Sequence, residues 1–157
     1  MSQAPVVKIT PPSRAKIDEL IVLLYDAWNL EAVITETQKV QHIAQRVSAK
    51  NRIPAEAEKV TAMQAHQDGT VEMAKVLLQQ VQDKMGAFVA EYLAQQGVVK
   101  GMTLFDSSGL PFTVQRTFLV LDWMRNDAVQ IVLKDADSDT VRLGIYLDQG
   151  ALIRIAE

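Results

Sequence analysis

Apolar residues recur every three or four positions over residues 71–93, the most regular hydrophobic pattern in the chain. This spacing places them on one stripe of a helix, because a strand would need an alternation that residues 79–84 do not show. Further apolar residues flank the stripe and widen the apolar face beyond about 100°. The pattern therefore predicts a helix that needs more than one partner. Its stripe consists of Val71, Ala74, Leu78, Val81, Met85, Phe88 and Tyr92.

The surrounding pattern predicts two long helices joined by a short turn. The first is expected from about Ser13, a suitable N-cap, to about Lys50. The second is expected from Pro54, which suits a first helical position, to about Gln96, before Gly97. A short connection forces the two helices to run antiparallel.

The two ends of this hairpin differ in their apolar surface. Residues 17–30 form a broad apolar face that would meet residues 71–93 at the open base. A narrow seam at coiled-coil spacing follows in the first helix, at Val33, Thr37, Val40, Ala44 and Val47. We expect the broad base to be covered by a second copy, giving a four-helix dimer, or by the rest of the chain. The candidate interface residues are Leu20, Leu24, Trp28, Leu78, Val81, Met85 and Phe88.

Residues 98–157 change to short β-rich segments separated by turn residues. Five strands in about sixty residues are typical of a small antiparallel barrel of the SH3-like or OB-like kind. The expected fold is therefore α+β, with a helical hairpin and a short extended leader in residues 1–97 and a barrel domain in residues 98–157. The expected strands are 98–105, 111–123, 129–133, 140–147 and 151–155.

The composition narrows the class of protein. With 157 residues, 48% hydrophobic and 22% charged, the chain is typical of a globular protein of one domain or two small ones. The net charge of −3 argues against broad attraction to nucleic acid or to an acidic membrane. Cysteine is absent, which excludes disulfides and thiolate chemistry and fits a reducing compartment. No signal-type leader or spanning apolar run is apparent, so we expect a cytoplasmic protein.

Three aspartates at alternating positions, Asp135, Asp137 and Asp139, resemble the start of a calcium-binding loop. The glycine required at the sixth position is Thr140, and the glutamate required at the twelfth is Tyr146. The segment is therefore predicted to be an acidic turn between two strands.

His42 and His66 are the only histidines, and both fall off the predicted seam. A metal site would need a third ligand beside them, and the register supplies none. Without cysteine, and with both histidines on the hairpin, few residues could act as the nucleophile and the general base of an enzyme. No metal site, no cofactor and no enzymatic activity is predicted.

Basic residues gather near the predicted hairpin tip, diluted by Glu56 and Glu58. They are either a contact for an acidic partner or a phosphate backbone, or the ordinary solvated charges of helix ends. The second interpretation is favoured, because basic side chains are common at helix termini. The residues are Arg46, Lys50, Arg52 and Lys59.

In length and outline the chain resembles the bacterial transcript-cleavage factors, which join a coiled-coil hairpin to a globular domain and insert the hairpin into RNA polymerase. Those proteins carry a close acidic pair at the tip to hold a metal ion. Here the acids lie beyond the turn, at Glu56 and Glu58. The likeness is one of shape, and shape does not carry function.

The first functional hypothesis is a non-enzymatic adaptor or scaffold that binds a protein partner and forms a homo-oligomer, expected to be a dimer, through the hairpin base. The alternative is a regulator associated with nucleic acid or RNA polymerase, using the barrel and the basic tip. Residues 98–157 hold six basic and eight acidic residues, which disfavours the alternative.

Overall fold

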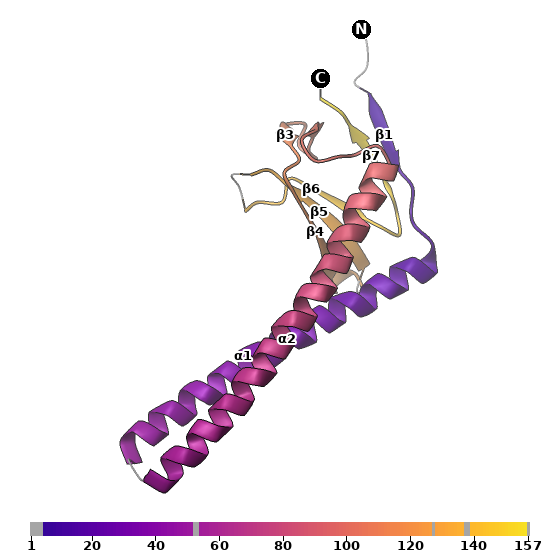
Figure 1. Ribbon diagram of the computed structural model, residues 1–157. Helices are drawn as coiled ribbons and strands as arrows, with labels where there is room; N and C mark the ends of the chain where they lie inside the picture. The colour runs from indigo at the N-terminus through magenta and orange to yellow at the C-terminus, as the bar shows by residue number, and fades with distance from the viewer. Residues whose placement is uncertain (1–4, 52–53, 127, 137–138, 157) are drawn as a thin grey trace. The chain divides into compact units, whose positions relative to one another are not determined.

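The computed structural model describes residues 5–51, 54–126, 128–136 and 139–156, without the side chains of 47–51, 54–57 and 60. It is a mixed α+β protein with two long helices and a β region (Figure 1). The chain divides into two compact units. We call residues 1–24 together with 83–157 the mixed unit, and residues 25–82 the helical unit.

Helices α1 (Arg14–Asn51) and α2 (Pro54–Gln95) begin and end within one residue of the predicted limits. The hydroxyl oxygen of Ser13 accepts a hydrogen bond from the backbone N–H of Lys16 at 3.2 Å, which is the predicted N-cap. After α2, Gly97 has a φ of 90°, and the N–H of Val98 donates to the Leu93 carbonyl at 2.8 Å. These features form a Schellman motif, which explains why the helix stops there. No helix in the described part of the chain is long and apolar enough to cross a membrane.

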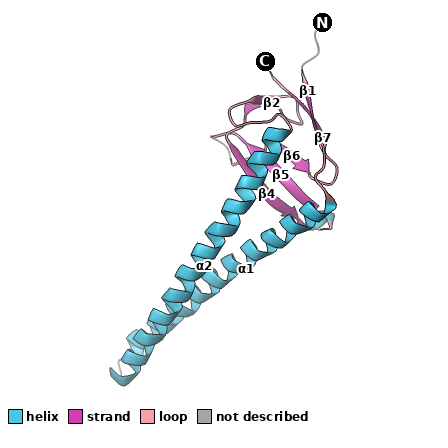
Figure 2. Cartoon of the chain, turned by 45° about the vertical axis from the view of Figure 1, so that its right-hand side comes forward, coloured by secondary structure: helices cyan, strands magenta, loops and turns pink. Residues whose placement is uncertain are grey.

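Within the helical unit α1 and α2 run antiparallel, side by side (Figures 1 and 2). The predicted α1 seam is wrong at Val33 and Val40, which are both exposed. The amide of Gln41 on α1 donates to the Asp68 carboxylate on α2 at 2.7 Å and ties the helices together. The residues that turn inward are Leu30, Ile34, Thr37, Gln41 and Ala44 on α1, and Gln64, Gln67, Val71, Ala74 and Leu78 on α2.

The predicted five-stranded barrel is not confirmed, and the described strands do not form a closed barrel. In the described residues the strands form three small antiparallel sheets with the orders β1–β7, β2–β3 and β4–β5–β6. The predicted strand 111–123 is broken at Val114 and Gln115, and Trp123 begins a short 3-10 turn, η1. The elements are β1 (Val6–Ile9), β2 (Thr103–Phe105), β3 (Pro111–Thr113), β4 (Arg116–Asp122), η1 (Trp123–Arg125), β5 (Ala128–Lys134), β6 (Leu143–Tyr146) and β7 (Ala151–Arg154).

The extended leader is a structural strand. β1 pairs with β7, with Val6 opposite Arg154 and Ile9 opposite Ala151. This pairing brings the two ends of the described chain into one sheet, which local sequence patterns do not predict. It also draws Ile9 into the core of the mixed unit.

The core of the mixed unit joins helix ends to strands. Leu20 of α1 and Val89 and Leu93 of α2 pack in one cluster with Ile9 and with strand residues of the same chain. In this unit, therefore, the β region covers the wide apolar base of the helices. The strand residues of the cluster include Leu104, Phe112, Val129, Ile131, Leu133, Ile145 and Ile153.

Candidate functional site

The predicted interface residues do not share one environment. Leu20 is fully buried in the core of the mixed unit, and Leu24 and Phe88 are half-buried against that core. Leu78, Val81 and Met85 are half-buried, whereas Trp28 is exposed. The base residues of the mixed unit thus contribute to the fold of the chain itself.

Of the four basic tip residues, Arg46 and Lys59 lie exposed on α1 and α2. The side chain of Lys50 and the whole of Arg52 lie outside the described residues. The structure therefore does not test the predicted cluster.

The acidic turn after β5 holds its described carboxylates close to arginines. Asp135 accepts from Arg142 Nη1 at 2.9 Å, and an oxygen of Asp139 lies 3.8 Å from Arg116 Nη1. Asp137 lies outside the described residues. Over the described ranges no three His, Asp or Glu side chains gather where they could hold a metal ion.

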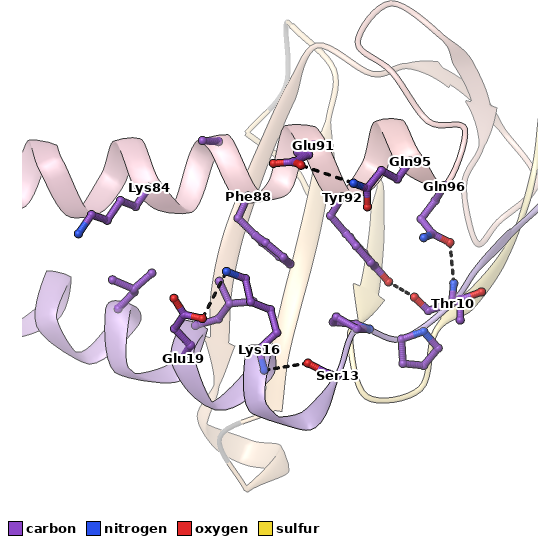
Figure 3. Close-up of a pocket in the computed structure, with 15 residues that line it drawn as sticks. Thr10, Ser13, Lys16, Glu19, Lys84, Phe88, Glu91, Tyr92, Gln95 and Gln96 are labelled. Atoms are coloured by element: carbon purple, nitrogen blue, oxygen red, sulfur yellow. Dashed lines mark hydrogen bonds and ion pairs between the residues drawn. The ribbon is translucent and has the colours of Figure 1, made fainter.

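A groove of about 810 Å³ lies in the mixed unit, between the start of α1 and the end of α2 (Figure 3). Its wall holds the stacked rings of Phe88 and Tyr92, whose centroids are 5.5 Å apart. The Lys16 ammonium lies 5.2 Å from the centre of the Phe88 ring and 3.3 Å from a Glu19 carboxylate oxygen. Charges of both signs line the groove, so its electrostatics select no class of ligand.

The polar contacts of this groove join parts of the same chain. The Tyr92 hydroxyl donates to the Thr10 carbonyl, and the Gln96 side chain accepts from the Thr10 N–H at 2.9 Å. Burial raises the pKa of the Tyr92 hydroxyl. These bonds fasten the segment between β1 and α1 to the end of α2, which is a structural role.

A second polar cluster is centred on Arg142, between β5 and β6. Its guanidinium donates to Asp106 at 3.0 and 3.2 Å and to Asp135 at 2.9 Å. The other oxygen of Asp106 accepts from the hydroxyl and the N–H of Ser108 and from the N–H of Leu110. The Ser108 hydroxyl first, and then the other donors, lower the pKa of Asp106 to about 2 from an ordinary 3.8. The cluster pins the turn between β2 and β3.

This network predicts a loss of stability in acid. The pKa of Asp106 is lower in the folded state, so its contribution is complete above about pH 4 and is lost as the pH falls towards about 2. In Asp106→Asn the free energy of unfolding should be lower at neutral pH and should vary less between pH 4 and pH 2. Urea titrations at several pH values measure this, with Asp148→Asn as the exposed control. Equal pH dependence in wild type and Asp106→Asn would show that the network is not formed.

An exposed turn with a rigid base lies at η1. One oxygen of Asp122 accepts from the Met124 N–H at 3.0 Å, and the other accepts from the Tyr146 hydroxyl at 2.6 Å. The Arg125 guanidinium lies 4.6 Å from the centre of the Tyr146 ring. The bond from Tyr146 is the main cause of a lowered pKa at Asp122. The turn presents Trp123, which is 58% exposed, and Met124, which is 96% exposed.

The helical unit carries exposed apolar side chains on both of its helices. On α1, Val33, Val40 and Ile43 recur at intervals of seven and three residues, which keeps them on one side of the helix. On α2, Met73 and Leu77 lie one turn apart. We call this surface the apolar face; it consists of the exposed residues Val33, Val40, Ile43, Met63, His66, Thr70, Met73 and Leu77.

Two shallow hollows lie on this face, and the first is lined by residues of both helices. One, of about 560 Å³, has Leu30 and Val33 of α1 on one side and His66, Met73 and Leu77 of α2 on the other. The second, of about 320 Å³, also contains His66, beside Ala62, Met63 and Gln67. The small residues Ala65, Gly69, Thr70 and Ala74 also line the first hollow.

The opposite side of the helical unit is mostly polar, although Trp28, three positions before Glu31, and Val76, one turn after Glu72, are also exposed there. On each helix, the exposed polar residues of this side are spaced by four, three and four positions. Besides the inner stripe that forms the seam, each helix therefore has one side that belongs to the apolar face and one side that is mostly polar. We call the polar set the polar face; it consists of Glu31, Thr35, Gln38 and His42 on α1 and Asp68, Glu72, Lys75 and Gln79 on α2.

No protein-family model, curated protein or solved structure matches this chain. The functional argument therefore depends on the surface itself. Contiguous exposed apolar patches are uncommon on soluble monomers and usually mark a contact with a partner. The apolar face is the strongest candidate site on this basis.

The predicted interface residues and the apolar face have no residue in common. The sequence predicts Val33 and Val40 in the seam, and it selects neither Met73 nor Leu77 as a surface residue. The available signal was the excess of apolar positions: α1 and α2 carry more of them than a two-helix seam can bury. Which of these positions face outward depends on the rotation of each helix, which the structure supplies.

Proposed function

We propose that the protein is a non-enzymatic adaptor or scaffold whose helical unit binds a protein partner through the apolar face. The observation that carries the proposal is the contrast between two sides of one helical pair. Val40 and Met73 are 50% and 67% exposed on one side, while the other side is mostly polar. A hairpin that only spaced two parts of a protein would have no need of this contrast.

The form of the face suits a helical partner. Hollows between ridges of alternating large and small side chains accept the side chains of another amphipathic helix at spacings of three and four residues. Met73 and Met63 add adaptable side chains that repack around different shapes. The partner is therefore expected to present an apolar helical stripe.

An adaptor also needs a second contact surface, and the turn at η1 offers one in the mixed unit. Trp123, Met124 and Arg125 are residue types enriched at protein interfaces. The hydrogen bonds of Asp122 fix the backbone beneath them. A fixed turn loses little conformational entropy when it binds.

Affinity isolation with three baits tests the proposal. The baits are wild type, the face variant Val40→Lys with Met73→Lys, and the matched control Gln38→Lys with Gln82→Lys. Both variants add two positive charges at exposed helical positions. The proposal expects a protein that wild type and control retain and the face variant loses, and that binds purified wild type in calorimetry at least about tenfold more tightly than it binds the face variant.

Proteins retained equally by all three baits would contradict the proposal. Circular dichroism of each bait confirms that the helices are intact, so that loss of binding cannot be assigned to unfolding.

A further inference from the structure

We propose that the free edge of strand β4 pairs with the same edge of a second copy of this chain. The three-stranded sheets of the two copies would then join into one continuous antiparallel sheet. This edge belongs to the mixed unit, so the pairing is independent of the apolar face and goes beyond the proposed function.

β4 is an edge strand without the usual protection. In the described part of the chain it is hydrogen-bonded to β5 on one side and to no strand on the other (Figure 2). It has seven residues, whereas the other described edge strands have three or four. Its ladder with β5 runs from Arg116 to Asp122 without a bulge, and the strand contains no proline, glycine or lysine. Proteins usually protect long edges with such residues or with bulges, so this edge is suited to pair with a further strand.

The side chains of β4 are less covered than those of β5 on both sides of the sheet. On the core side, Leu119 is half-buried, although Ile131, which lies opposite it on β5, is 0% exposed. On the outer side, Phe118 is 44% exposed and its neighbour Val132 is 4% exposed. Exposure therefore rises towards the free edge, as expected where no further strand follows.

Two hydrogen bonds show which way the backbone groups of β5 point. The Leu147 N–H, next to β6, donates to the Val129 carbonyl at 3.0 Å, and the Gln115 N–H, next to β4, donates to the Lys134 carbonyl at 3.0 Å. Backbone groups of successive residues point to opposite sides of a strand. The odd-numbered residues of β5 therefore bond towards β6, and the even-numbered ones bond towards β4.

The register between the two strands carries this alternation to the edge. Even-numbered residues of β4, such as Phe118 and Val120, lie opposite even-numbered residues of β5 and bond to them. The N–H and C=O groups of Thr117, Leu119 and Leu121 point the other way. Each of these three residues offers one donor and one acceptor to a further strand.

A second copy fits this edge in one register. Two antiparallel strands related by a two-fold axis pair well only when outward-pointing residues lie opposite each other. An axis at Leu119 uses all three such residues, because Leu119 then lies opposite its own counterpart and Thr117 lies opposite Leu121 of the second copy. An axis moved by one residue would pair one of the three with a residue outside β4.

The charges of β4 are complementary in this register. Arg116 lies opposite Asp122 of the second copy, and the same pair repeats at the other end of the two strands. Both side chains are held at the ends of β4, because Arg116 donates to the Asp135 carbonyl at 3.2 Å and Asp122 accepts from the Tyr146 hydroxyl at 2.6 Å. A parallel pairing would place like charges together, which destabilises paired strands.

The apolar side chains agree with the charges. On the outer side of the sheet, the exposed ring of Phe118 lies opposite Val120 of the second copy. Pairs of an aromatic and a β-branched residue stabilise neighbouring strands. Charge, register and side-chain pairing thus make β4 complementary to itself, which selects a second copy as the partner of this edge.

Hydrogen exchange of the full-length wild type, resolved to single amides, tests the pairing. A single strand pair is smaller than a standard interface, so we expect a dissociation constant of about 10–50 μM. At about 1 μM the amides of Thr117, Leu119 and Leu121 should exchange fast, whereas those of Phe118 and Val120 are protected by β5. At about 500 μM the first three should exchange at least about fivefold more slowly. Equal rates for these three amides at both concentrations would overturn the inference.

Sedimentation equilibrium of two variants shows whether β4 forms the interface. Val120→Lys and Thr117→Pro should each weaken the dimer at least about tenfold. The lysine would lie beside Phe118 of the second copy, and the proline removes an N–H that the sheet of its own chain does not use. The control is Leu152→Lys, which adds the same charge at a strand position that is 73% exposed and should leave the dimer unchanged. Circular dichroism confirms that each variant is folded.

A wild type that is monomeric at about 500 μM would overturn the inference, and so would a dimer that either folded β4 variant leaves intact. The face variant, Val40→Lys with Met73→Lys, should dimerise like wild type, because its charges lie in the helical unit. The proposed function fails or stands separately. If β4 does not pair while a protein partner still requires Val40 and Met73, the function stands. If the dimer forms through β4 and no protein requires these two residues, the function fails and the inference stands.

Discussion

Leu20→Asp is expected to unfold the mixed unit. Leu20 is 0% exposed and lies in the cluster that joins α1 and α2 to the strands. Truncation of a buried leucine to alanine typically costs about 2–5 kcal/mol, and a buried carboxylate with no partner adds several more. A domain of this size is stable by about 5–15 kcal/mol, so the variant should lose most of its folded population.

Val22→Asp is the matched control, because Val22 lies two residues away on the same helix and is 58% exposed. It places the same charged residue on the same helix, and it should change the free energy of unfolding by about 1 kcal/mol or less. Thermal melts followed by circular dichroism compare the two variants. If both melt near the wild-type temperature, the helix base is not covered by the strands of its own chain.

Gly150→Ala is expected to be the most damaging glycine substitution in the mixed unit. Gly150 has a φ of 68°, and a methyl group added there would overlap the backbone carbonyl oxygen of Ile9 in β1. An alanine at positive φ costs about 1–2 kcal/mol, and overpacking against backbone adds about 1–3 kcal/mol. Because Ile9 is paired with Ala151, the added methyl group should push β1 away from β7.

Gly109→Ala separates the two effects. Gly109 also has a positive φ, 84°, but an added methyl group would meet only the end of the Arg154 side chain at 3.8 Å. We expect Gly109→Ala to lose about 1–2 kcal/mol, and Gly150→Ala to lose more and to expose the amides of β1 to hydrogen exchange. Equal losses in urea unfolding would show that β1 does not pack against Gly150.

The sequence predicts the helices well because their ends are set locally. Ser13, Pro54 and Gly97 each define a terminus through groups within a few residues, so the limits were right to within one position. The strands were found for the same reason, since alternation and turn residues are local signals. The described limits of β5 and β7 lie within one residue of the predicted ones.

Long-range arrangement was not predictable from the same signals. The five-stranded barrel was not confirmed, because strand pairing depends on contacts between distant residues, and β1 pairs with β7 from the other end of the described chain. The α1 seam was wrong at Val33 and Val40, because Ile34, Thr37 and Gln41 turn inward instead. Two of these three residues are polar, so apolar spacing alone does not reveal the rotation of the helix, which decides which apolar residues reach the surface.

The methionines of the apolar face give the most direct test of the central claim, that this face binds a protein partner. Met63 and Met73 are 56% and 67% exposed in a single chain, and Met124 of the η1 turn is 96% exposed. Peroxide oxidation of purified protein, read by peptide mass spectrometry, compares the three within one sample. The account predicts that saturation with the partner that wild type retains in affinity isolation protects Met63 and Met73 relative to Met124. Oxidation of Met63 and Met73 at the same rate relative to Met124 with and without that partner would contradict it.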